Sequence, residues 1–185
     1  MAEVLVITAS PRKKSNSAKI AEELVKILQF KTSETVNINS LKITPCSACG
    51  SCVSSFSCVY KDDAPRLISK IKKAKVIIIA SPVYFCGVPA PLKAFIDRNQ
   101  PEWERHNKKT STVNKKGIII LTAGGNEKKY FLPAKREIAS MFAVNGIKTL
   151  KVLTFGGMDE TGAAEKSRDI MKKIRAAAGS VNGLR

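Results

Sequence analysis

The sequence predicts an α/β protein built on a doubly wound parallel sheet. Short apolar runs alternate five times with longer segments of helical periodicity. Three of these runs, at residues 3–8, 75–81 and 117–122, read as continuous apolar strands. Strands of this kind are covered on both faces, and they occur in parallel sheets with helices on either side.

The first half of the chain supplies two strand–helix units. Residues 3–8 (EVLVIT) form the first strand, and residues 15–29 form a helix. Apolar residues recur along that helix at helical spacing: Ile20, Leu24, Ile27 and Leu28. Residues 34–39 alternate like a strand, and a cysteine-rich loop at 45–60 follows (here called the cysteine loop). Residues 62–74 then predict a helix whose apolar side carries Leu67, Ile68 and Ile71.

The second half supplies three more units. The predicted strands cover residues 75–81, 117–122 and 148–155, and the predicted helices cover residues 88–98, 128–143 and 161–178. Residues 99–116 are polar and predict a long loop. No repeat, low-complexity segment or linker divides the sequence, so residues 1–185 are expected to form a single domain.

The net charge is +17, from 32 Lys and Arg against 15 Asp and Glu. Such a balance is compatible with nucleic-acid binding, but the lysines come as scattered pairs without interleaved aromatic residues. This distribution favours a solvated surface and no nucleic-acid partner. The alternative is a basic surface that attracts an acidic partner or a phosphorylated ligand.

The amino terminus predicts a cytoplasmic protein. Its apolar run is too short for a signal peptide, and Glu3 stands where a basic flank belongs. No stretch approaches the roughly 18 apolar residues of a membrane span, so no membrane partner is expected. Because the cytoplasm is reducing, clustered cysteines are expected to bind metal or to be redox-active rather than to form structural disulfides.

Ligands of such sheets bind outside the carboxyl ends of the strands. Three loops there form the predicted site: 9–17 after the first strand, 81–91 after the third and 122–126 after the fourth. The first loop is rich in hydroxyls and precedes a helix amino terminus, where free N–H groups favour an anion such as a phosphate monoester. The alternative for Ser15 or Ser17 is simple helix capping.

These loops resemble those of the NADPH-dependent FMN reductase family. The resemblance rests on SPRKKSNS after the first strand, on the block Ser81–Arg98 (SPVYFCGVPAPLKAFIDR) and on the turn Gly124-Gly125. It implies a flavodoxin-like sheet of five strands in the order 2-1-3-4-5. It also implies FMN, with its phosphate in the first loop and its ring against the other two. The implied FMN-binding residues are Ser10, Arg12, Ser15, Asn16, Ser17, Pro82, Val83, Tyr84, Phe85, Cys86, Gly87, Thr122, Ala123, Gly124 and Gly125.

Four of the five cysteines lie within thirteen positions of the cysteine loop: Cys46, Cys49, Cys52 and Cys58. The spacing resembles the motif of the iron–sulfur flavoprotein branch of the family, which implies a 4Fe-4S cluster. Four thiolates from one loop suffice for such a cluster. Free or redox-active thiols remain an alternative. Zinc is another, although its ligands usually come as two separated pairs.

The leading hypothesis is therefore a redox flavoprotein, an oxidoreductase that carries electrons between a 4Fe-4S cluster and FMN. The alternative is a clusterless NAD(P)H-dependent FMN or quinone reductase. A basic nucleic-acid-binding module is the least favoured hypothesis. The resemblance also implies NAD(P)H as reductant, a redox protein such as a ferredoxin as partner, and a homodimer or homotetramer. No side-chain nucleophile or general base is required, so no catalytic residue is predicted.

Three residues stand apart from these motifs. Cys86 occupies a position where the family usually has glycine, so it is either a small buried residue or a thiol beside the flavin. Trp103, in the predicted loop 99–116, suits a lid or a subunit contact, or else a plain surface loop. His106 is expected to be solvated.

Overall fold

The computed structural model describes residues 2–108 and 115–182. It contains one parallel sheet with the strand order β2-β1-β3-β4-β5, which confirms the predicted fold class. The strands are β1 (Val4–Thr8), β2 (Ser33–Asn37), β3 (Val76–Pro82), β4 (Lys115–Thr122) and β5 (Ile147–Phe155). The helices are α1 (Asn16–Ile27), α2 (Cys52–Ser55), α3 (Asp63–Lys73), α4 (Ala90–Asp97), α5 (Gln100–Lys108), α6 (Lys128–Val144) and α7 (Arg168–Asn182), with short 3₁₀ turns η1 (Ile38–Ser40) and η2 (Ala163–Lys166).

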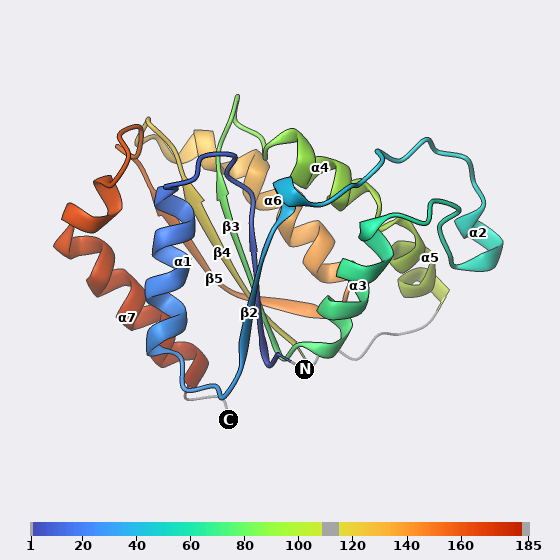
Figure 1. The fold of residues 1–185 in the computed structure, drawn as a ribbon, viewed down its shortest axis with the longest axis horizontal. Coiled ribbons are helices and arrows are strands. Elements are labelled where there is room, and N and C mark those ends of the chain that lie inside the picture. Colours follow the sequence, from blue (N-terminus) through green and yellow to red (C-terminus); the bar gives the residue numbers. More distant parts are fainter. Residues whose placement is uncertain (1, 109–114, 183–185) are drawn as a thin grey trace.

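Helices cover both faces of the sheet, as the apolar strands predict. Helices α1 and α7 lie on one face, and α3, α4 and α6 lie on the other (Figure 1). Side chains of β1 alternate between the two cores: Val4 and Val6 pack toward α1 and α7, while Leu5 and Ile7 pack toward α3, α4 and α6. This two-sided burial explains the continuous apolar runs in β1, β3 and β4.

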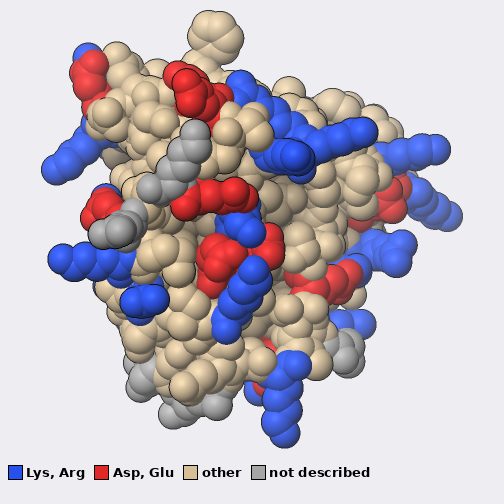
Figure 2. All heavy atoms as spheres, turned by 60° about the vertical axis from the view of Figure 1, so that its left-hand side comes forward, with Lys and Arg blue, Asp and Glu red and all other residues tan. Residues whose placement is uncertain are grey.

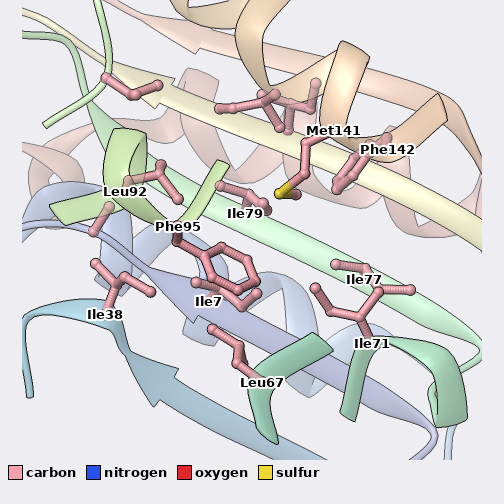
Figure 3. Packing of buried hydrophobic residues seen from close by; sticks show 14 of the residues in the cluster. Ile7, Ile38, Leu67, Ile71, Ile77, Ile79, Leu92, Phe95, Met141 and Phe142 are labelled. Atoms are coloured by element: carbon pink, nitrogen blue, oxygen red, sulfur yellow. The ribbon is translucent and has the colours of Figure 1, made fainter. Parts of the chain in front are cut away.

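Helix α4 is fixed in the second core by Leu92 and Phe95, both fully buried. Figure 3 shows these two side chains in the same cluster as Ile7 and Ile79 of the sheet and Leu67 of α3. Arg98, which ends α4, follows Phe95 by about one helical turn. The packing of Phe95 therefore also determines where Arg98 lies.

The prediction of a loop over residues 99–116 is wrong for its first part, because Gln100–Lys108 form α5. Polar composition suggested a loop, yet Glu102 and Glu104 are buried. Glu102 forms ion pairs with Lys72 of α3 and Arg105, so these polar residues stabilise a packed helix instead of a solvated loop. Residues 109–114 of that prediction lie outside the described residues.

Two smaller predictions also need correction. The closing helix begins at Arg168 and not at 161, because Gly162 adopts a left-handed conformation (φ +83°) and 163–166 form a 3₁₀ turn. The cysteine loop is not wholly irregular, since Cys52–Ser55 form the short helix α2.

Charged side chains are dispersed over the surface. On the face shown in Figure 2, Lys and Arg alternate with Asp and Glu and do not form a stripe of one sign. On α1, Lys19 and Lys26 pair with Glu22 and Glu23. Within the described ranges 2–108 and 115–182, no helix is both long enough and apolar enough to span a membrane.

Candidate functional site

A small pocket of about 100 Å³ opens at the carboxyl ends of β1, β3 and β4 (here called the edge pocket). It brings together most of the residues that the sequence predicted for a cofactor: Ser10, Arg12, Ser15, Asn16, Pro82, Val83, Tyr84, Thr122, Ala123 and Gly124. Residues from three distant loops meet here because parallel strands end at the same edge of the sheet. Ser17, Phe85, Cys86, Gly87 and Gly125 do not line this pocket.

The first loop presents the amino terminus of α1 to the pocket. Ser15 is the N-cap, and its hydroxyl accepts a hydrogen bond from the Ala18 N–H at 3.3 Å. Its Oγ also lies 2.9 Å from the Oγ of Ser17, which is only 1% exposed. Ser15 therefore caps the helix and lines the pocket, whereas Ser17 lies behind it.

Asn16 ties this loop to the segment that follows β5. Its Nδ2 donates to the backbone oxygens of Met158 (3.0 Å) and Glu160 (2.7 Å), and its Oδ1 accepts from the Ala164 N–H (3.2 Å). The side-chain amide is thus occupied within the protein. Asn16 shapes the pocket wall by holding two loops together.

Positive charge surrounds the first loop. Arg12 and Lys14 line the pocket, and the first turn of α1 contains no acidic residue. Arg12 Nη1 donates to the backbone oxygen of Asp159 at 2.7 Å. Together with the free N–H groups of α1, these cations make the loop attractive to an anion.

The second loop forms a tight turn in which Tyr84 and Gly87 exchange two backbone hydrogen bonds, of 3.0 and 2.9 Å. The two central residues, Phe85 (φ +48°) and Cys86 (φ +65°), are both left-handed, a conformation usually left to Gly, Asn or Asp. The turn projects beyond the sheet between β3 and α4 (Figure 1), and the Phe85 side chain is fully exposed. The backbone oxygen of Cys86 accepts a hydrogen bond from the Ala134 N–H of α6 at 3.2 Å, which anchors the turn.

The third loop needs its glycines for close packing. A Cβ at Gly124 would lie 2.2 Å from a carboxylate oxygen of Asp159, and a Cβ at Gly125 would lie 2.8 Å from the Tyr130 ring. Both distances are too short for an unmoved neighbour. Gly124 therefore allows Asp159 to lie directly against the floor of the pocket.

Sequence reasoning missed three lining residues: Lys14, Met158 and Asp159. Lys14 adjoins the predicted motif. Met158 and Asp159 follow β5, which ends at the same edge as β1, β3 and β4. The strand-end rule that selected three loops would have found them had it been applied to the fifth strand.

A second and larger cavity, of about 310 Å³, lies under the cysteine loop (here called the cysteine cavity). All four predicted ligands line it, namely Cys46, Cys49, Cys52 and Cys58. The opposite wall comes from the end of α4 and the start of α5, including Arg98, Pro101 and Glu104. In Figure 1 the loop extends over α3, α4 and α5, on the side of the molecule away from α1 and α7.

The two ends of the cysteine loop are held together by Asp62 and Asp63. The Asp62 carboxylate caps α3 through the Ala64 N–H and also accepts from the Thr44 N–H at 2.9 Å. The Asp63 carboxylate accepts from the Lys42 N–H at 2.8 Å. These bonds make the chain leave and return at nearly the same place.

Arg98 also holds the two ends of the cysteine loop together. It is 2% exposed, and it donates to Asp62 (2.7 and 3.1 Å), to the backbone oxygen of Thr44 (2.7 Å) and, at 3.4 Å, to that of Tyr60. Burial opposes its charge, but the hydrogen bonds to Asp62, with a further electrostatic contribution from the neighbouring Cys58, outweigh this and raise the pKa of Arg98. Burial likewise opposes ionisation of Asp62, yet the bond from Arg98 outweighs it and lowers the pKa of that carboxyl.

The thiols differ in how readily they ionise. The Ser51 N–H lowers the pKa of Cys49. Burial, and then the negative charge of Glu104, raise the pKa of Cys52. The cavity therefore offers two thiols whose pKa values are shifted in opposite directions, that of Cys49 downward and that of Cys52 upward.

The four thiols line the same cavity but do not converge on a common point. Within residues 2–108 and 115–182, no three His, Cys, Asp or Glu side chains are close enough together to hold a metal ion. All five cysteines are free thiols. The edge pocket and the cysteine cavity have no lining residue in common.

The sequence pattern of one protein family matches most of the chain. The pattern described as NADPH-dependent FMN reductase matches residues 2–155, which include the cysteine loop and the edge-pocket loops after β1, β3 and β4. The chain belongs to the NADPH-dependent FMN reductase family. The family predicted from the sequence is therefore confirmed.

Within the FMN reductase family, the chain is similar to iron-sulfur flavoproteins. One from Archaeoglobus fulgidus is 38% identical over 121 residues, which cover 64% of this chain and 53% of the relative. Another from the same organism is 28% identical over 188 residues, which cover 98% of this chain and 91% of the relative. An FMN-dependent NADH:quinone oxidoreductase of Metamycoplasma arthritidis is 31% identical over 103 residues, or 52% of each chain. The match spans about half the length of several iron-sulfur flavoproteins.

Solved structures share the fold of this FMN reductase family member. An azoreductase from Bacillus anthracis str. Sterne superposes with a TM-score of 0.70 at 17% identity, covering 100% of both chains. An FMN-dependent NADH-azoreductase from Bacillus anthracis str. Ames Ancestor, solved in complex with FMN, gives 0.64 at 16% identity, covering 98% of this chain and 100% of the other.

Proposed function

We propose that this chain binds FMN at the edge pocket and a 4Fe-4S cluster in the cysteine cavity, and that it carries electrons between them. The observation that carries the proposal is that four cysteines, separated by as many as twelve positions, line one cavity. Four thiols facing a common space are the donor set that such a cluster needs. When bound, FMN would supply one- and two-electron chemistry and the cluster one-electron chemistry.

The edge pocket fits the phosphate end of FMN. The N-cap Ser15, the free N–H groups of α1 and the cations Arg12 and Lys14 all favour a doubly charged phosphate. Thr122 and Gly124 line the adjoining floor. These residues would bind and orient the cofactor without transferring a proton.

The flavin ring needs more room than the pocket offers. Its volume of about 100 Å³ is well below the roughly 300 Å³ at which enclosed ligand sites begin. We infer that the ring lies against the exposed Tyr84–Gly87 turn and that a second copy of the chain covers it. Support comes from Tyr84, which is 40% exposed, and from the fully exposed Phe85, both costly to leave in water.

The lining of the cysteine cavity also fits its proposed occupant in chemistry, because it supplies four thiols. Gly50, with φ +75° and no atom near its Cβ position, allows the loop to bend around a compact group. The thiols are not gathered as they stand, so the loop must draw inward when it binds iron. Because its backbone makes few hydrogen bonds between residues 46 and 58, this movement disrupts little regular structure.

The second candidate function is a clusterless NAD(P)H-dependent FMN or quinone reductase. It is favoured by the ungathered thiols and by similarity to the quinone oxidoreductase of Metamycoplasma arthritidis. In that case the edge pocket acts alone, with a nicotinamide or quinone stacking on the flavin, and the cysteines are free thiols.

Anaerobic reconstitution with iron and sulfide separates the two candidates. The parent protein is expected to retain about four irons per chain and one FMN, whereas Cys49→Ala should lose most of the iron and keep the FMN. Cys86→Ala, which removes a thiol outside the cavity, is the matched control for iron and should retain about four irons per chain. Less than one iron per chain in the parent, or stoichiometric zinc, would replace the proposal with the clusterless reductase.

A further inference from the structure

Arg98 is a buried cation whose partners all belong to the segment that carries the cysteines. Only 2% of it is exposed, and charged side chains are seldom so buried unless they are paired. Its guanidinium donates to Thr44, two residues before the first cysteine, and to Tyr60 and Asp62, which follow the last one. It therefore contacts the chain on both sides of the cysteine loop.

We propose that Arg98 is a positioning residue for the four-cysteine site, where it holds the two ends of the loop together and places a buried positive charge beside Cys58. This inference rests on the proposed function and deepens it. Arg98 lines the cavity that Cys58 and the other three cysteines share. An iron–sulfur cluster with four thiolate ligands carries net negative charge, so a buried cation beside it stabilises the bound and reduced forms.

The geometry requires arginine and not merely a cation. The planar guanidinium bonds both Asp62 oxygens and two backbone carbonyls at once, and its Cζ lies 5.0 Å from the centre of the Tyr60 ring. The Tyr60 hydroxyl in turn donates to Ser47 Oγ at 3.1 Å, inside the loop. Lysine would keep the charge but could satisfy only part of this network.

One donor of Arg98 is unused. Its Nε is buried and has no hydrogen-bond partner among the described residues. A buried, unsatisfied donor is costly, and a sulfur acceptor held in the cavity that Arg98 lines would relieve the cost. The position of Arg98 is fixed by the packing of α4, because Phe95, one turn earlier on that helix, is fully buried in the core.

Three variants test the proposal: Arg98→Gln, Arg98→Lys and the control Arg66→Gln, which changes an exposed arginine on α3. After anaerobic reconstitution, the Arg98→Gln protein should lose iron to a chelator about 10- to 100-fold faster than the parent, as is typical when a group behind metal ligands is removed. Its cluster midpoint potential should be more negative, because a positive charge is lost. Arg98→Lys should keep the potential near that of the parent while still losing iron faster.

Retention of FMN in each variant shows that the fold is intact, because the edge pocket shares no lining residue with the cysteine cavity. If Arg98→Gln does not fold, Arg98→Lys still tests the hydrogen-bonded network. Iron loss and potential equal to those of Arg66→Gln would overturn the proposal. Faster iron loss with an unchanged potential in Arg98→Gln would overturn its electrostatic part and leave only a structural role.

Hydrogen exchange of the iron-free protein distinguishes this inference from the proposed function. Amides of residues 45–60 should exchange faster in Arg98→Gln than in the parent, because the loop ends are released. An unchanged exchange rate would contradict the role of Arg98 whether or not iron binds. A parent that binds no iron would instead contradict the proposed function.

Discussion

The edge pocket and the cysteine cavity share no lining residue and are built by different means. The edge pocket is formed by strand ends, a helix amino terminus and close-packed glycines, so its shape follows from the regular backbone. The cysteine cavity is roofed by a loop that is mostly exposed and is held in place by side chains, chiefly Asp62 and Arg98. A group that binds at the edge pocket finds its contacts already in place. A group that binds in the cysteine cavity must draw its ligands together.

This contrast predicts that each site can lose its bound group without affecting the other site. Changes at the strand ends should release the flavin and leave the cysteines unaffected, and changes at Arg98 or the cysteines should do the reverse.

Ser15→Asp should weaken FMN binding by at least about 100-fold. Aspartate caps a helix as well as serine does, so α1 should persist. The new carboxylate, however, would face the phosphate at close range and repel it by several kcal/mol at an intermediate dielectric. Fluorescence titration of the flavin-free protein measures the effect, and Ser69→Asp on an exposed face of α3 controls for added charge. Unchanged FMN affinity would place the phosphate elsewhere.

Gly124→Ala should loosen FMN and destabilise the protein by about 1 kcal/mol, because the neighbour that must move is the exposed Asp159 side chain. The added methyl would meet the Asp159 carboxylate at 2.2 Å and displace the floor of the edge pocket. Gly179→Ala is the matched control, because no atom lies within 4 Å of its Cβ position on α7 and alanine favours the helix. Equal stability of the two variants in urea unfolding would show that the Gly124 turn is not tightly packed.

Acid should weaken the cysteine loop through Asp62. Its pKa is lowered in the folded protein, so its contribution to stability is complete above the unfolded pKa of about 3.9 and is lost as the pH falls through the lower folded value. Asp62→Asn keeps the helix cap but should flatten this dependence. Fluorescence of Trp103, the only tryptophan, reports on α5 beside the loop during urea unfolding. Parallel pH dependences for parent and variant would contradict the role of the Asp62–Arg98 pair.

Cys86→Gly should have the smallest effect. Glycine relieves the left-handed backbone at φ +65° but adds freedom to the unfolded chain, so a net stabilisation of up to about 1 kcal/mol is expected. Cys86→Ala keeps the strain and serves as the comparison in thermal unfolding. Iron content should equal that of the parent in both variants, and loss of iron from either would make Cys86 a ligand.

The sequence predicted the sheet and most of the edge pocket for one physical reason. A continuous apolar run indicates a strand that is buried on both faces of the sheet. Parallel strands bring the loops that follow them to one edge of the sheet. Residues such as Ser15, Tyr84 and Gly124 could therefore be grouped from their positions after the strands alone. Asp159 was missed only because the loop after β5 was not included.

The supports of the cysteine cavity could not be predicted in the same way. Arg98 is part of a recognisable motif, but nothing local shows that Thr44, Tyr60 and Asp62 converge on it from up to 54 positions away. The sequence pattern did not predict helix α5, because its buried residues Glu102 and Glu104 are charged. Such side-chain pairing depends on tertiary packing, which periodicity does not report.

The central claim is that both redox groups occupy one chain and exchange electrons. An anaerobic reductive titration of the reconstituted protein tests it directly, with the flavin followed by absorbance and the cluster by low-temperature electron paramagnetic resonance. The account predicts uptake of about three electron equivalents per chain, roughly two by the flavin and one by the cluster, with the cluster's share absent from Cys49→Ala. Uptake of only about two equivalents by the parent, with no cluster signal, would contradict it.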